Sequence, residues 1–129
     1  MTYEETFKQN LEAIINPLGF IVDWDVIGNS GVTHRFGYGH RDARIGIEFH
    51  PKVADEAPIL SSYLKVLDSK IRCYLVVQDN AKSLVVQKIS KSDKDKTVKE
   101  LADSYNLPIY EQAELKQLEE ELKSMLKRV

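Results

Sequence analysis

Apolar residues recur along the chain at spacings that predict both helices and strands. Helices are predicted over residues 3–16, 55–69, 97–105 and 113–128. Alternating apolar and polar residues, typical of half-buried strands, cover 20–26, 32–38 and 44–50. Two short apolar runs, 73–77 and 84–89, predict further strands, the first of them buried on both faces. The uninterrupted polar segment 90–96 predicts an exposed loop.

Three of the predicted helices carry an apolar stripe that is expected to face a core. These stripes consist of Phe7, Leu11, Ile14 and Ile15, of Leu60, Leu64 and Leu67, and of Leu115, Leu118, Leu122 and Met125. The last helix is otherwise densely charged. Packing against its own sheet and pairing with a second copy explain its stripe equally well, so a homodimer through the C-terminal helix is one prediction.

The order helix, three strands, helix, strand, helix, helix predicts an α/β fold with a mixed β-sheet flanked by helices. The first three strands are expected to form a meander, and the helix over 55–69 then returns the chain so that 73–77 lies parallel to a neighbour. If Tyr38 pairs with Ile47, Gly37 lies opposite Glu48 on the same face. A shift of one residue would separate them.

The length of 129 residues fits a single domain, residues 1–129, with a core of its own. No apolar run approaches the length of a membrane-spanning helix, so no membrane partner is expected. The acidic, polar first residues lack the chemistry of a signal peptide. The single cysteine, Cys73, allows no internal disulfide, and we expect a cytoplasmic protein in which Cys73 is a small core residue.

The net charge of −2 gives no general attraction to nucleic acid, but the charges are unevenly distributed. Residues 1–27 hold one lysine and five carboxylates, whereas 28–52 hold a small basic excess and all three histidines. The second window is therefore where a functional site is expected. The candidates for weak contacts with nucleic-acid phosphates are Arg35, Arg41, Arg44 and Lys52.

The sequence has no glycine-rich phosphate loop, Cys-x-x-Cys pair or Gly-x-Ser-x-Gly elbow. Residues 30–36 read Ser-Gly-Val-Thr-His-Arg-Phe, and 48–50 read Glu-Phe-His. The first segment resembles the second strand of small archaeal members of the PD-(D/E)XK superfamily, in which a metal-binding aspartate follows. The second segment lies where that superfamily has Glu-x-Lys. With the order of elements, the resemblance covers roughly residues 2–110 and implies a restriction-endonuclease-like fold.

The resemblance implies a nuclease centre in which two carboxylates hold Mg²⁺ or Mn²⁺ and a lysine helps the nucleophile. The chain has Gly37 in place of the aspartate and His50 in place of the lysine. Glu48 and His50 are therefore the catalytic candidates. The candidates for a relocated metal site are Glu48, Asp25, Asp42, Glu5 and Glu12. An alternative set, suited to a transition metal, consists of His34, Glu48 and His50.

Three functions remain open at this point. The first is a restriction-endonuclease-like domain with a degenerate centre, which needs no cofactor and binds nucleic acid or a protein partner without cutting. The second is an active nuclease that depends on Mg²⁺ or Mn²⁺ held by relocated ligands. The third is a structural or assembly module that has kept only the fold.

Overall fold

The computed structural model describes residues 1–86 and 96–128, so the predictions for 87–89 and 90–95 lie outside the described residues. The helices are α1 (Tyr3–Ile15), α2 (Ala57–Ser69), α3 (Val98–Ser104) and α4 (Leu115–Leu126). The strands are β1 (Ile21–Ile27), β2 (Thr33–His40), β3 (Ile45–His50), β4 (Arg72–Val77), β5 (Val85–Val86), β6 (Lys96–Thr97) and β7 (Ile109–Glu111). Short 3-10 helices cover Asn16–Leu18, Ala81–Ser83 and Gln112–Glu114.

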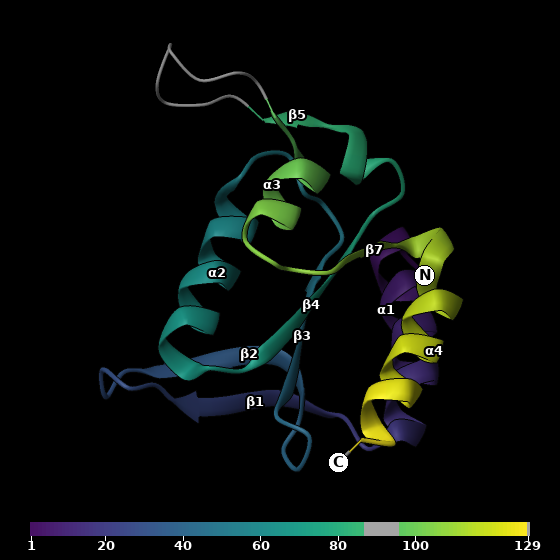
Figure 1. The fold of residues 1–129 in the computed structure, drawn as a ribbon. Coiled ribbons are helices and arrows are strands. Elements are labelled where there is room, and N and C mark those ends of the chain that lie inside the picture. The colour runs from purple at the N-terminus through teal and green to yellow at the C-terminus, as the bar shows by residue number, and fades with distance from the viewer. Residues whose placement is uncertain (87–95, 129) are drawn as a thin grey trace, which may run out of the picture.

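Five strands form one mixed sheet in the order β1-β2-β3-β4-β7 (Figure 1). β1, β2 and β3 are antiparallel neighbours and β4 runs parallel to β3, so the predicted meander and crossover are confirmed. Tyr38 pairs with Ile47, which confirms the predicted register. β7 extends the sheet parallel to β4 and is not predicted by the sequence pattern. β5 and β6 pair in a separate two-stranded sheet.

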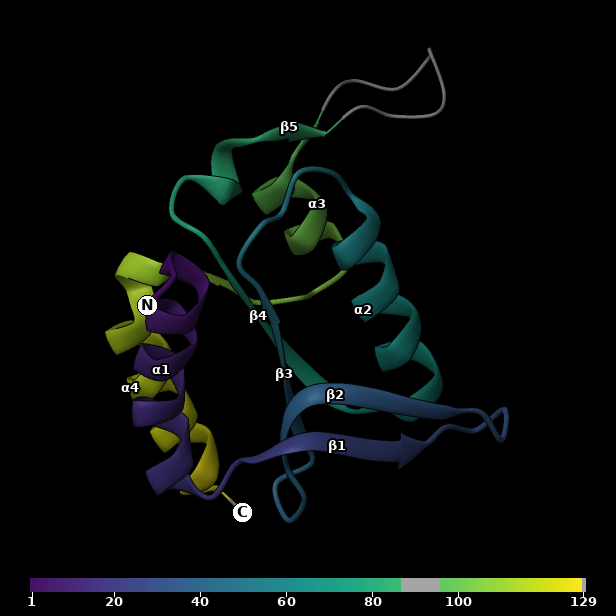
Figure 2. The same ribbon diagram turned by 180° about the vertical axis from the view of Figure 1, so that it is seen from behind.

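Helices cover both faces of the five-stranded sheet (Figures 1 and 2). The α1 and α4 side chains share a core with one face, and those of α2 and α3 share a core with the other. β1 forms a free edge, at which Ile21, Val22 and Ile27 are exposed. The protein is therefore an α/β structure with a mixed sheet flanked by helices. None of the helices in the described ranges is long and apolar enough to cross a membrane.

The first helix forms as its sequence predicts. Its N-terminus is a capping box, in which the Thr2 hydroxyl accepts the Glu5 N–H while the Glu5 carboxylate accepts the Thr2 N–H. The buried positions of the helix are Phe7, Leu11 and Ile15. This stripe fixes α1 against the sheet.

The apolar stripe predicted for the second helix does not face the core, which corrects that prediction. The buried residues of α2 are Ile59, Ser62 and Ser69, whereas Leu64 is 62% exposed and Leu67 is 47% exposed. The row that packs on the sheet includes two small serines, so apolar content alone selects the wrong side of the helix. α2 consequently carries an apolar row on its outer face.

The C-terminal helix packs its apolar seam inside the protein, so the prediction of a homodimer through this helix loses the exposed seam on which it depended. Leu118 and Leu122 have no exposed surface, and Leu115 is also buried. They share a core with α1 and with Tyr74 and Val76 of β4. Leu115, Leu118 and Leu122 are therefore covered by the chain's own sheet and first helix, and Met125, the last residue of the seam, is partly buried.

Candidate functional site

The pairing of β2 with β3 places Glu48 beside Gly37. Glu48 is only 6% exposed, and its Oε2 lies 3.4 Å from the Gly37 backbone nitrogen, which donates to it. A Cβ atom at Gly37 would lie 3.8 Å from that oxygen and 3.2 Å from the Ile47 carbonyl oxygen. Gly37 therefore presents no side chain to Glu48, although a carboxylate at this position would lie close to it.

Glu48 forms an ion pair with Lys65, which lies on α2. Lys65 Nζ donates to Glu48 Oε1 at 2.5 Å and to the carbonyl oxygen of Arg35 at 2.7 Å. The ammonium group also lies 5.7 Å from the centre of the Phe36 ring. A carboxylate removed from water needs a compensating charge and hydrogen bonds. Lys65 supplies that charge to Glu48.

His50, the second catalytic candidate from the sequence, is not a cation at neutral pH. Burial lowers the pKa of His50 below its ordinary value of 6.5; Glu48 opposes this shift and Lys65 adds to it. The Nε2 atom is buried and has no hydrogen-bond partner within the described ranges. His50 is therefore a neutral imidazole beside the Lys65–Glu48 pair.

The lowered pKa of His50 predicts a loss of stability in mild acid. Below pH 6.5 the unfolded chain takes up a proton at this residue that the folded protein resists, so the free energy of unfolding falls as the pH drops toward the folded pKa. Urea unfolding at pH 7.5 and pH 5.5 measures this slope, and His50→Gln is expected to flatten it. His40→Gln is the control for loss of a histidine elsewhere, and an unchanged slope in His50→Gln would contradict the assignment.

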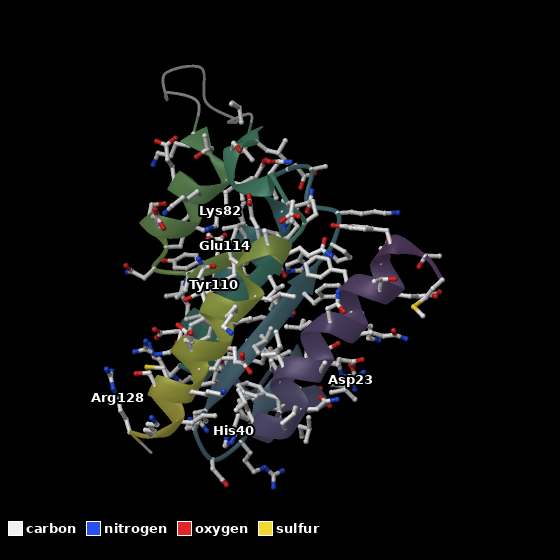
Figure 3. The ribbon with its side chains drawn as sticks, turned by 90° about the vertical axis from the view of Figure 1, so that its right-hand side faces the viewer. Asp23, His40, Lys82, Tyr110, Glu114 and Arg128 are labelled. Atoms are coloured by element: carbon white, nitrogen blue, oxygen red, sulfur yellow. The ribbon has the colours of Figure 1, made fainter. Side chains whose placement is uncertain are left out.

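A cleft of about 340 Å³ opens beside Glu48 between α1 and the β1 edge of the sheet. Its lining includes the carboxylates of Glu4, Asp23 and Glu48, together with Lys8 and Gly37. Asp23 lies on β1 between Val22, which pairs with Tyr38, and Trp24, which pairs with Phe36, so it is opposite Gly37. The backbone of Asp23 has a left-handed φ of 54°. Figure 3 shows Asp23 beside α1. Asp23 thus borders the space that a side chain at residue 37 would enter.

The carboxylates that the sequence suggests as relocated ligands lie elsewhere. Asp25 accepts hydrogen bonds from the Arg35 guanidinium at 2.9 and 3.2 Å, and this pairing lowers the pKa of Asp25. Asp42 is exposed in the turn between β2 and β3. The turn is separated from Glu48 by several residues of β3, on the order of 10 Å. Neither side chain is brought to Glu48.

The two glutamates of the first helix are also engaged elsewhere. Glu5 belongs to the capping box, and Glu12 Oε2 accepts the Tyr38 hydroxyl at 3.1 Å. Burial, with the nearby Glu12 charge, raises the pKa of Tyr38. Within the described residues, no group of three or more His, Cys, Asp or Glu side chains is arranged to hold a metal ion.

The four basic residues of 28–52 do not gather in one patch. Arg35 pairs with a carboxylate of β1, and Lys52 Nζ lies 2.7 Å from Glu4 Oε1. Arg41 and Arg44 lie in the turn after β2, where Arg44 donates to the Ser69 carbonyl oxygen. Along β2, this turn and Arg35 are on the order of 15 Å apart.

His34, part of the alternative metal set, instead joins the β1–β2 turn to α2. Its Nε2 lies 2.6 Å from Asp68 Oδ2, and the same carboxylate accepts the Ser30 hydroxyl at 2.6 Å and the Ser30 N–H at 2.9 Å. The hydrogen bonds from Ser30, followed by that to His34, lower the pKa of Asp68 to about 2. This arrangement is that of an ordinary hydrogen-bonded histidine.

Sequence reasoning missed Lys65, Asp23 and Glu4 as members of the site. Lys65 lies 17 residues from Glu48 in sequence, and only the crossing of α2 over β2 brings the two together. For Asp23, its position opposite Gly37 in the meander was an available signal. Comparison of the chain with family models, curated proteins and solved structures finds no match in any of the three.

Proposed function

We propose that the chain is a restriction-endonuclease-like domain that has lost the metal-dependent nuclease centre and acts by binding a partner. The observation that carries this proposal is the ion pair between Lys65 and Glu48, next to a glycine at residue 37. The resemblance of residues 30–36 and 48–50 to the superfamily motifs adds support. So does the succession of α1, a three-stranded meander, α2 and a parallel β4.

The donors around Glu48 do not fit a divalent metal ion. Mg²⁺ requires several oxygen ligands in octahedral geometry, and one carboxylate is a poor site for it. The Lys65 ammonium already neutralises Glu48 at 2.5 Å, so a metal would have to displace it against charge repulsion. His50 Nε2 is a nitrogen ligand, which Mg²⁺ does not favour.

A protein partner fits the surface better than nucleic acid does. Two of the four basic candidates, Arg35 and Lys52, are already paired with carboxylates, and the other two lie in a distant turn. Binding through three or four phosphates would be weak and would decline steeply with salt. By contrast, exposed leucines on α2 offer an apolar contact of the kind that proteins bind.

Titration calorimetry with Mg²⁺ or Mn²⁺ tests the loss of the metal centre. The parent protein is expected to give no binding heat below millimolar metal. Gly37→Asp combined with Lys65→Met supplies a second carboxylate and removes the competing ammonium, so metal binding is expected to strengthen by about tenfold or more. Gly37→Asn controls for the added volume beside Ile47, and Thr33→Asp controls for a new charge at an exposed position of β2. Submillimolar binding by the parent would overturn the proposal.

The cleft lined by Glu4, Asp23 and Glu48 favours a second candidate, an active nuclease with relocated carboxylates. If the parent binds metal, this candidate expects Asp23→Asn to abolish binding. Asp25→Asn is the matched control, because Asp25 is two residues away on β1 and is engaged with Arg35. Equal loss in both variants would show that the cleft is not the metal site.

A further inference from the structure

The outer face of α2 carries leucines at the spacing of a helix-pairing seam. Leu60, Leu64 and Leu67 follow one another at intervals of four and three residues, which places them on one side of the helix. Leu64 and Leu67 are 62% and 47% exposed. Figures 1 and 2 show α2 at the outside of the molecule, with α3 toward its inner side.

The two ends of this helix carry opposite charges. Asp55 and Glu56 precede α2, and Lys70 follows it. None of these three forms an ion pair with another residue in the described ranges. When two copies of such a helix pack antiparallel, their apolar rows meet, and the acidic end of each helix lies beside the basic end of the other.

We propose that a second copy of the chain docks on this face, with the two α2 helices antiparallel about a two-fold axis near Leu64. This arrangement places Leu60 of one copy beside Leu67 of the other and brings the two Leu64 side chains together. It also sets Glu56 of each copy opposite Lys70 of the other. A parallel arrangement would bring like charges together at both ends, so the charges specify the antiparallel one.

The size of the helix sets the strength of this association. α2 has 13 residues, and a helix of that length is about 20 Å long. A contact confined to one such helix per copy lies at the small end of specific protein interfaces, so we expect weak association, with a dissociation constant on the order of 10–100 µM. The inference rests on the partner-binding part of the proposed function and identifies the partner of the α2 leucines as a second copy of the chain. Its test is separate from the metal titration, because dimerisation through α2 does not depend on whether the Glu48 site holds a metal.

Sedimentation equilibrium from about 5 to about 500 µM brackets this affinity. The mean mass is expected to rise from 14.8 kDa toward twice that value as concentration increases. Leu64→Asp is expected to keep the protein monomeric throughout. Ile21→Asp is the matched control, because Ile21 is 52% exposed at the first position of β1, at the opposite end of that strand from the turn that contacts Asp68 of α2. A monomeric parent at every concentration, or dimerisation unchanged by Leu64→Asp, would overturn the proposal.

A charge exchange tests the antiparallel direction. Glu56→Lys places like charges at both ends of the seam and is expected to weaken dimerisation several-fold. Adding Lys70→Glu to the same chain restores opposite charges between the copies and is expected to recover the parental affinity. If the double variant remains as weak as Glu56→Lys alone, the antiparallel arrangement is wrong.

Discussion

Replacement of Lys65 by methionine is expected to lower the free energy of unfolding by about 3 kcal/mol, because it leaves the Glu48 charge buried and uncompensated. The Glu48 side chain is 8% exposed, so water compensates its charge only in part once the ammonium is removed. Lys65 itself is 25% exposed, which places the expected cost at the lower end for a broken buried pair. Urea unfolding monitored by circular dichroism at neutral pH measures the difference.

A double-mutant cycle separates the ion pair from simple packing. Glu48→Gln alone is expected to cost less than Lys65→Met, because the long lysine side chain can extend its ammonium toward solvent. The double variant Lys65→Met with Glu48→Gln is expected to recover at least half of the loss. A cost below about 0.5 kcal/mol for Lys65→Met, the size of an ordinary surface change, would show that Glu48 does not depend on Lys65.

Leu118→Ala is expected to destabilise the protein by about 3 kcal/mol, since it removes buried methyl groups and leaves a cavity between α4 and the sheet. Leu118 has no exposed surface and lies in the core that α1 and α4 share with β3 and β4. Chemical denaturation of the monomer at low protein concentration measures this effect. The expected loss is independent of protein concentration, because the seam is internal.

Leu64→Ala makes the same chemical change on α2 and serves as the control. Leu64 is 62% exposed, so truncating it is expected to alter the stability of the monomer by no more than about 0.5 kcal/mol. The two variants therefore distinguish the leucine row of α4, which stabilises the core, from that of α2, which is exposed on the surface. Equal stability losses, or a loss in Leu118→Ala that depends on protein concentration, would contradict that assignment.

The alternation of apolar and polar residues made the central sheet predictable. The side of α2 that faces the core was harder to predict, because this helix has apolar residues on both its inner and its outer side. Tyr38 of β2 shares one buried core with Ile45 and Ile47 of β3, and the pairing of Tyr38 with Ile47 keeps these apolar residues together, whereas a shift of one residue would separate them. On α2, the row that packs inward includes Ser62 and Ser69, whose small size permits close approach to the sheet. Apolar content consequently selected the leucine row, which is exposed. β7 has three residues, too few to show a period.

The candidate site was predictable only where it depends on strand pairing. The proximity of Gly37 and Glu48 follows from register alone. The position of Asp23 opposite Gly37 also follows from register, although its left-handed backbone does not. Lys65 depends on how α2 crosses the sheet, which leaves no periodic signal in the sequence. The basic residues cluster in sequence, but β2 carries Arg35 to one end of the strand and Arg41 to the other.

The free edge of β1 bears on how the protein avoids aggregation. An exposed strand edge with apolar side chains such as Ile21, Val22 and Ile27 is a template on which other chains can add as intermolecular β-structure. Here two carboxylates interrupt that template. Asp25 adds charge, and the left-handed φ of Asp23 breaks the edge into two stretches too short for extended pairing. The same aspartate that borders the cleft thus also acts as a gatekeeper against fibril-like assembly.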